Sequence, residues 1–282
     1  MTNPFFIAAS ADKYSIARLA DIYNESRVDY IVPMPMNTKR LHDYVAQYDV
    51  DLSASVVAVN QDQQVAGIGM LGVRGTRAWI TRLGVIPTRR GRGVGQFIMD
   101  SLLTNAVSRG CQSVLLEVIE GNEPAYGLFS KLSFETTRRL LVIRRAPNPL
   151  PAETLRVEPL NIDQITLFLS RRPPVASWLN ETPSILAGGS TVEGLCVSLD
   201  SGEMGWIVYR STPFQLSHFI LGSVTDDLSD ECARALLRVV HTRHPRRDTK
   251  VENLPADSPL WAAYQALGYG IEFTRIEMIK PL

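Results

Sequence analysis

Several things are scarce in this 282-residue sequence, and each shortage narrows the range of functions. The three cysteines, Cys111, Cys196 and Cys232, lie far apart without metal-like spacing, so we expect buried, reduced thiols and no metal site. No apolar run approaches the roughly 20 residues of a membrane helix, and the opening segment lacks the basic start of a secretory signal. These shortages predict a cytoplasmic protein with no membrane partner.

Net charge is also absent, because 29 Lys plus Arg residues balance 29 Asp plus Glu residues. No global field therefore recruits nucleic acid, and an anionic ligand has to be met locally. The four histidines stand beside no recognisable nucleophile or metal partner. The chain is longer than one hydrophobic core usually organises, which favours two domains.

The first half predicts short alternating strands and helices. Apolar alternation indicates strands at 5–9, 55–60, 64–73, 77–85, 113–118 and 136–144, and helical periodicity indicates helices at 15–27, 38–48, 93–108 and 123–132. The proline-rich segment 146–153 continues neither kind of element. We interpret it as a linker between domains at 1–145 and 154–282.

The second half repeats this plan. It predicts a strand at 155–158, a helix at 163–170, strands near Leu195, Trp206 and Phe219, and a helix at 230–241. Residues 116–134 overlay residues 251–269 without a gap, which pairs Glu117 with Glu252 and Phe129 with Tyr264. The simplest interpretation is a duplicated α/β unit whose copies have diverged.

The segment 86–95 runs from a strand into a helix and carries glycines and arginines suited to an anion. Glycines let backbone N–H groups converge on a phosphate, and the helix N-terminus and the arginines add positive charge. Its GxGxG spacing differs from the dinucleotide GxGxxG, and no Gly-Lys-Ser/Thr of a P-loop follows. We interpret it as a pyrophosphate loop, in preference to a basic surface turn that only caps a helix.

This pattern resembles the GNAT family of N-acetyltransferases, whose signature Arg/Gln-x-x-Gly-x-Gly/Ala is matched by Arg90, Gly93 and Gly95. A second family signature is matched within 117–134, with Ser133 in place of its glycine. The resemblance covers roughly residues 5 to 145. It implies an α/β (α+β) fold of two tandem GNAT-type domains, each a mixed, mostly antiparallel sheet flanked by helices.

The resemblance also implies acetyl-CoA as co-substrate, with the pantetheine arm paired to a strand that splays from its neighbour. The implied cofactor-binding residues are Leu83, Gly84, Val85, Arg90, Gly91, Arg92, Gly93, Val94, Gly95, Asn122 and Phe129.

The catalytic positions depart from the family. Phe129 stands where the family has the tyrosine that protonates the departing thiolate, so Tyr126 on the same helix is the candidate acid, with a packing role as its alternative. Glu117, on the strand next to the predicted splay, is the candidate base. Its alternative is a structural carboxylate, because Glu252 recurs in the second copy.

The resemblance implies direct acetyl transfer from acetyl-CoA to a primary amine of a small molecule or peptide, by a monomer or homodimer. Because Phe129 cannot donate a proton, a non-catalytic acyl-CoA-binding sensor or regulatory protein is the alternative. Asp21, Glu25 and Asp29, on the first helix and its following loop, fit a cationic acceptor or simply a solvated helix face.

The second copy is expected not to bind CoA. Aligning Leu83-Gly84 with Leu221-Gly222 places Asp226, Asp227, Ser229, Asp230 and Glu231 opposite the arginines and glycines of the first copy. Carboxylates there would repel a pyrophosphate. The family also ends in a strand pair of which only 136–144 precedes the linker, so we expect the second half to supply the missing strand.

Overall fold

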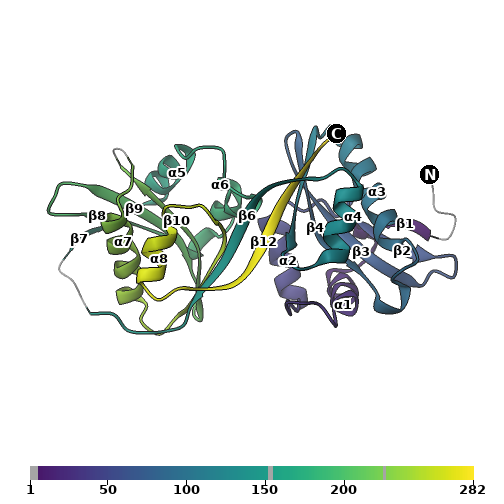
Figure 1. Cartoon of the computed structure of the whole chain (residues 1–282), viewed down its shortest axis with the longest axis horizontal. Helices are drawn as coiled ribbons and strands as arrows, with labels where there is room; N and C mark the ends of the chain where they lie inside the picture. Colours follow the sequence, from purple (N-terminus) through teal and green to yellow (C-terminus); the bar gives the residue numbers. More distant parts are fainter. Residues whose placement is uncertain (1–5, 152–154, 225–226) are drawn as a thin grey trace. The chain divides into compact units, whose positions relative to one another are not determined.

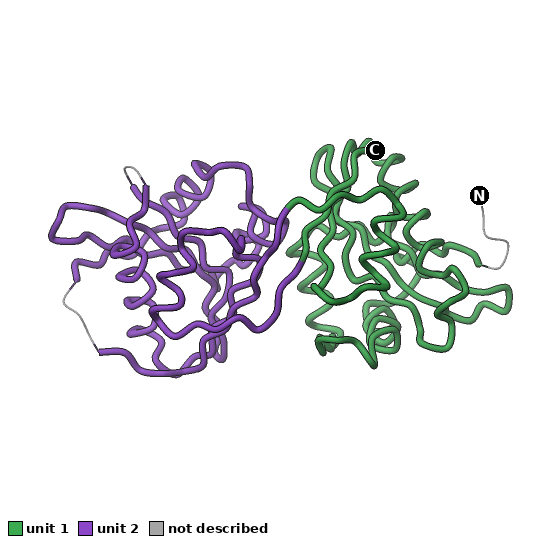
Figure 2. Tube along the Cα trace, viewed as in Figure 1, with its two compact units in different colours: residues 1–137, 276–282 green, residues 138–275 purple. Residues whose placement is uncertain are grey.

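The structure, a computed structural model, describes residues 6–151, 155–224 and 227–282 (Figure 1). Its contacts divide the chain into two compact units (Figure 2). Unit 1 comprises the residues up to Thr137 together with 276–282, and unit 2 comprises 138–275. The division falls inside two long strands, β6 (Glu135–Arg145) and β12 (Gly270–Pro281), rather than in the segment 146–153, of which 152 and 153 lie outside the described residues.

Unit 1 is built on a mixed sheet with the strand order β1-β2-β3-β4-β5-β12-β6. Its first five strands are β1 (Phe6–Ser10), β2 (Val56–Asn60), β3 (Val65–Arg74), β4 (Arg77–Val85) and β5 (Ser113–Ile119). The strands β1 to β4 pair antiparallel, and β4 pairs parallel with β5. The predicted strand at 5–9 is therefore found one residue later, and Phe5 lies outside the described residues.

Four helices cover the two faces of this sheet: α1 (Ile16–Ser26), α2 (Thr38–Gln47), α3 (Val94–Ser108) and α4 (Glu123–Lys131). Because side chains alternate along a strand, Ala78 and Ile80 of β4 pack in the core with α3, whereas Trp79 packs against Tyr44 of α2. Side chains cap the starts of α1, α2 and α4; the Ser15 side chain, for example, accepts from Arg18 N.

The C-terminal residues 276–282 complete unit 1. Met278 is 1% exposed and belongs to the same core cluster as α3 and α4. The Leu282 amide donates to Gln112 O at 2.9 Å, and Thr137 Oγ1 donates to Glu277 Oε2 at 2.9 Å. The expectation that the second half of the sequence supplies a strand to the first domain is confirmed.

Unit 2 has the strand order β12-β6-β11-β10-β9-β8-β7. Its remaining elements are β7 (Arg156–Pro159), α5 (Ile162–Ser170), α6 (Thr182–Leu186), β8 (Val192–Ser198), β9 (Met204–Ser211), β10 (Gln215–Ser223), α7 (Asp230–Arg243), β11 (Asp248–Pro255) and α8 (Trp261–Ala266). The short helix α6 was not predicted, because five residues carry too little periodicity to indicate a helix.

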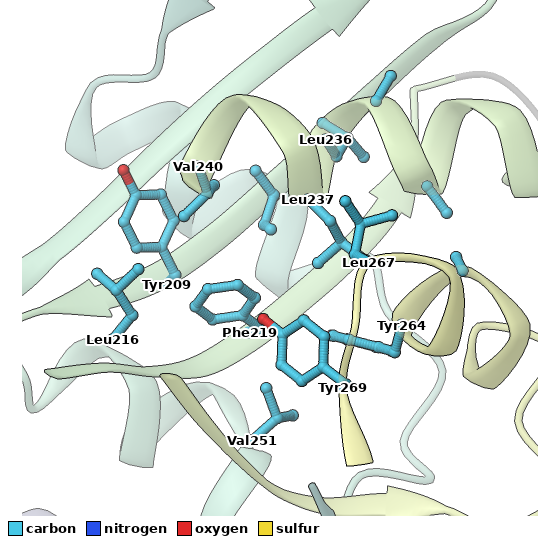
Figure 3. Packing of buried hydrophobic residues seen from close by; sticks show 14 of the residues in the cluster. Tyr209, Leu216, Phe219, Leu236, Leu237, Val240, Val251, Tyr264, Leu267 and Tyr269 are labelled. Atoms are coloured by element: carbon cyan, nitrogen blue, oxygen red, sulfur yellow. The ribbon is translucent and has the colours of Figure 1, made fainter. Parts of the chain in front are cut away.

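The core of unit 2 repeats the two-sided packing of unit 1. Tyr209 packs with α7 and α8 in a cluster that contains Tyr264 (Figure 3), and the neighbouring Val208 packs on the other face with α5 and α6. Tyr264, which occupies the family's tyrosine position, is 1% exposed, and burial raises the pKa of its phenol. Its role is therefore packing in this core.

All three cysteines are free and buried. Within 6–151, 155–224 and 227–282, no helix is long and apolar enough to cross a membrane. The same described residues contain no group of three His, Cys, Asp or Glu side chains that could hold a metal ion.

Candidate functional site

The strands β4 and β5 separate in the middle of unit 1. Their parallel pairing runs from Arg77 and Ser113 to Ile80 and Leu116, although β4 itself continues to Val85. Arg82 at the point of separation has a left-handed backbone, with φ of 53°, and the register between β3 and β4 shifts there. Such a bulge bends one strand away from its neighbour. The predicted splay at residues 83–85 is thus built by a bulge in β4.

The loop 86–95 joins the splayed strand to α3. It contains a short turn at Pro87–Arg89, and Gly91 and Gly93 have φ of 73° and 78°, which glycine adopts without steric cost. Gly93 precedes the first residue of α3, and no side chain caps this end of the helix. The first amides of a helix have no partner within it, so they face the loop as donors for an anion.

Arg89 and Arg92 lie on the flank of the loop. Together with the turn after β2 they line a cavity of about 450 Å³, whose wall comprises Phe6, Asn60, Gln61, Asp62, Arg89 and Arg92. Arg89 also donates to Gln64 Oε1 at 2.5 Å. The arginines of the loop are therefore spread around it rather than directed at one point.

Arg90 is engaged by the end of α1. Its Nη1 and Nη2 donate to the two carboxylate oxygens of Asp29 at 2.7 Å each, Nη2 also donates to Ser26 O at 3.2 Å, and Nε donates to Val85 O at 3.1 Å. Hydrogen bonds from Arg90 hold the pKa of Asp29 below its usual value. Both side chains keep about half of their surface in solvent, at 43% for Arg90 and 53% for Asp29.

The acidic residues suggested for an acceptor do not form one surface. Glu25 pairs with Arg18 at 2.9 Å on the outside of α1, Asp21 is exposed, and Asp29 pairs with Arg90. The buried side chains of α1 and α2 are instead mostly apolar, and they include the aromatic Tyr23 and Tyr44. A cationic acceptor therefore has little support from the first helix.

Glu117 lies on the face of the sheet that α2 covers. Its Oε2 accepts a hydrogen bond from Trp79 Nε1 at 2.8 Å, and Trp79 is 2% exposed. On the same face Arg82 donates to Tyr23 Oη at 3.1 Å, with its guanidinium 4.1 Å from the centroid of Tyr44. Burial raises the pKa of Tyr44 to about 12. This aromatic surround was missed in the sequence, because the rings come from helices distant in the chain and look there like ordinary core residues.

Tyr126 lies on the other face. It packs at the edge of the core formed with α3, and its hydroxyl is 3.3 Å from Thr136 Oγ1. Glu117 alternates with the core residues Leu116 and Val118 and so points away from that cluster. The structure does not bring the candidate acid and the candidate base together.

The remaining cofactor candidates lie on α4. Asn122 caps the helix, its side chain accepting from Ala125 N at 3.4 Å, and its Nδ2 donates to Tyr30 Oη at 3.2 Å. Phe129 is 5% exposed, with its ring centroid 6.1 Å from that of Phe134. Asn122 therefore stands at the end of β5 beside the splay, whereas Phe129 belongs to the core.

Unit 2 repeats the bulge and the separation of strands. His218 has φ of 54°, and the parallel pairing of β10 with β11 runs from Gln215 and Asp248 to Ser217 and Lys250. The two bulges pair Arg82 with His218, and the residues that precede α3 and α7 pair Gly93 with Ser229, so both features give the same alignment of unit 1 with unit 2. This structural alignment is shifted by two residues from the sequence alignment of Leu83-Gly84 with Leu221-Gly222.

In this structural alignment, acidic residues of unit 2 still correspond to residues of the loop 86–95 in unit 1. Asp227 matches Gly91 and Glu231 matches Gly95, while Asp226 lies outside the described residues. In addition, the start of α7 already holds a carboxylate, because Glu203 accepts from Ser229 N at 2.9 Å and from Ser229 Oγ at 2.6 Å. The anion position of unit 2 is filled from within the chain.

The splay of unit 2 is also occupied. Asn180, in the turn Trp178–Asn180, donates through Nδ2 to Glu252 O on β11 at 2.9 Å. Glu252 is held in turn by Arg275 at 2.6 Å. Burial favours the neutral carboxyl, but the charges of Arg275 and Lys250 outweigh it and lower the pKa of Glu252 to about 2. The residue matching Glu117 is thus a structural anion.

Part of the chain is similar in sequence to known acetyltransferases. Residues 18–134 match the acetyltransferase (GNAT) family. The chain is 36% identical over 73 residues to an acetyltransferase of Pectobacterium atrosepticum, covering 26% of this chain and 52% of that protein. It is 33% identical over 106 residues to a mycothiol acetyltransferase of Clavibacter michiganensis, covering 38% of this chain and 35% of that protein. The chain thus spans about half the length, or less, of these curated relatives.

A solved structure extends the likeness to both units. The chain superposes on a tandem GNAT protein from the clavulanic acid biosynthesis pathway with a TM-score of 0.64 and 15% identity, covering 98% of each chain. At that identity the likeness concerns the fold. Residues 18–134 thus match the GNAT acetyltransferase family, and the two units have the fold of a tandem GNAT protein.

Proposed function

We propose that this protein transfers an acetyl group from acetyl-CoA to a primary amine of a small molecule or peptide. The cofactor would lie in unit 1, with its pantetheine arm along residues 83–85 and its pyrophosphate on the loop 86–95. The observation that carries the proposal is the coincidence of a splayed strand with an uncapped helix N-terminus directly after it. Two of the relatives named above are acetyltransferases, which agrees with it.

The residues of unit 1 suit a direct transfer. Glu117 would accept the proton that the amine loses as its nitrogen bonds to the thioester carbon, and backbone amides of β4 would stabilise the oxygen as charge develops. The C–S bond then breaks, and the sulfur leaves as a thiolate. Tyr126 would return a proton to it, although a thiolate with a pKa of about 8.5 also leaves unaided near neutral pH.

A non-catalytic acyl-CoA-binding protein is the second candidate. It is favoured by Phe129, which supplies no hydroxyl and is buried, and by the Tyr126 hydroxyl, which lies on the opposite face from Glu117 and near Thr136. The two candidates share the cofactor site and differ only in turnover. Release of CoA thiol across a broad panel of amines separates them, because a sensor binds acetyl-CoA but releases none.

The cofactor site is tested by Gly95→Glu. This substitution places a glutamate in the loop of unit 1 at the position that corresponds to Glu231 in unit 2. Gly95 is in the first turn of α3 without a positive φ, so an L side chain fits the backbone, and a carboxylate there favours the helix dipole. The new charge would repel the pyrophosphate. We expect acetyl-CoA affinity, measured by calorimetry, to fall at least about ten-fold, which corresponds to one lost charge-assisted hydrogen bond.

Gly95→Ala is the matched control, because it adds the same Cβ without the charge. That Cβ meets only Leu128 Cδ2 at 3.2 Å and Val85 Cγ2 at 3.7 Å, and both are side-chain ends that can shift. We expect affinity close to that of the natural chain. Equal affinity of the glutamate and alanine variants would refute the loop as the phosphate site.

A further inference from the structure

The segment that follows α1 crosses the opening between β4 and β5. On the β4 side Arg27 Nη1 donates to Leu83 O at 3.2 Å, and Gly84 lies so close to Ser26 that a Cβ would overlap it. On the β5 side Tyr30 Oη accepts from Asn122 Nδ2 at 3.2 Å. The guanidinium of Arg27 also stacks on Tyr30, 3.4 Å from its centroid. Residues 26–30 therefore form a strap across the splay, attached at both of its sides.

The strongest attachment of this strap is the pair formed by Asp29 and Arg90. The carboxylate meets the guanidinium fork with two bonds of 2.7 Å, and Ser26 O accepts from the same Nη2. A guanidinium recognises carboxylate and phosphate with the same planar fork. Asp29 therefore accepts the hydrogen bonds from the guanidinium donors of Arg90 that a phosphate would otherwise accept. The ion pair is also exposed enough for a ligand to reach it from solvent.

Unit 2 shows the same replacement in a permanent form. There Glu203 bonds Ser229 at the start of α7, where it takes the place of an anion with an amide and a hydroxyl as donors. Asp29 differs because it holds an exposed arginine side chain and leaves the amides of α3 free of a side-chain cap. An incoming phosphate can therefore reach those amides first and then compete for Arg90.

We propose that Asp29 is an internal stand-in for the cofactor's phosphate, which Arg90 exchanges for the phosphate when acetyl-CoA binds. This rests on the proposed function. The exchange releases the strap from the loop while its contacts with Leu83 and Asn122 remain. Asp29 thereby sets the affinity for the phosphate-bearing part of the cofactor.

The test is Asp29→Asn, which keeps the size of the side chain and removes its charge. Because the competing ion pair is exposed and of modest strength, we expect acetyl-CoA to bind about two- to five-fold more tightly. Acetyl-pantetheine, which lacks the phosphates, is the matched probe and should bind equally to both proteins. In an Arg90→Gln background the substitution of Asp29 should change nothing, because the partner of the exchange is gone.

The outcomes are distinct. Weaker or unchanged acetyl-CoA binding by a folded Asp29→Asn variant, beside clear binding by the natural chain, would overturn the exchange and leave the proposed function standing. A gain that persists with Arg90→Gln, or that also appears with acetyl-pantetheine, would overturn it as well. Absence of binding by the natural chain and the variant alike would refute the proposed function, and the exchange with it.

Discussion

Glu117 is the residue on which catalysis by this chain depends in the proposed mechanism. Its carboxylate accepts a hydrogen bond of 2.8 Å from the indole of Trp79, and it lies on β5 directly after the point where the pairing with β4 ends. The sequence could predict Glu117 as a candidate because it is a carboxylate on the strand next to the predicted splay. It could not predict Trp79 as its partner, because the two are separated by 38 residues and meet only through strand pairing.

Replacing Glu117 with Gln keeps a hydrogen-bond acceptor for Trp79 and removes the base. General base catalysis is worth about 10² to 10⁴ in rate, so we expect kcat/KM to fall at least about 100-fold while acetyl-CoA affinity is kept. Steady-state kinetics with the best amine of the panel and calorimetry with acetyl-CoA provide the two measurements. A loss smaller than about three-fold would remove Glu117 from the mechanism and return it to a structural role.

His241 in unit 2 makes stability depend on pH. It belongs to α7 and is fully buried, and its Nε2 is 2.8 Å from Tyr269 Oη. Burial, with the nearby Arg145, lowers its pKa to about 3. An unfolded histidine has a pKa of about 6.5, so between these values the unfolded chain binds the additional proton. The contribution of neutral, buried His241 to the free energy of unfolding is therefore complete above pH 6.5, and it is lost progressively as the pH falls below that value.

For this single group the loss amounts to about 2 kcal/mol at pH 5. We expect His241→Gln to reduce the difference between the unfolding free energies at pH 7.5 and pH 5, measured in urea. A remaining slope is expected from His218 and His244, whose pKa values burial also lowers. An identical pH dependence in the natural chain and the variant would show that His241 is not the titrating group.

The sequence predicts most element boundaries of unit 1 within one or two residues, because its strands and helices have clear periodicity and three of the four helices, α1, α2 and α4, begin at a side-chain cap. The bulge in β4 is not predictable, since Arg82 adopts a left-handed backbone that the sequence reserves in most places for glycine. The strap over the splay is not predictable either. Asp29 and Arg90 are 61 residues apart, and no local pattern links them.

The C-terminal part of β12 is predicted to be essential to unit 1. Met278 is 1% exposed in the core that carries α3, so Met278→Ala should lower the free energy of unfolding by about 2 to 5 kcal/mol. Leu282→Ala, at a side chain that is 41% exposed, is the control and should cost little. Denaturant unfolding of the full chain checks both. Equal stability of the two variants would contradict the assignment of 276–282 to unit 1.

At the scale of the whole molecule, the duplication was evident from the overlay of 116–134 on 251–269, and so was the acidic character of the second loop. The structure adds the physical reason for the difference between the copies. Both units keep the bulge and the separated strands, but in unit 2 Glu203 fills the helix start and Asn180 fills the splay. In unit 1 the helix α3 starts at Gly93 without a side-chain cap, whereas in unit 2 the Ser229 side chain caps α7.

We propose that each chain has one acetyl-CoA site, at the loop 86–95 of unit 1, and calorimetric titration of the full chain with acetyl-CoA measures the number of sites. We expect a stoichiometry of one, with binding lost or weakened at least about ten-fold in Gly95→Glu and kept in Gly95→Ala. A stoichiometry of two, or one site that the Gly95→Glu substitution leaves unchanged, would contradict it.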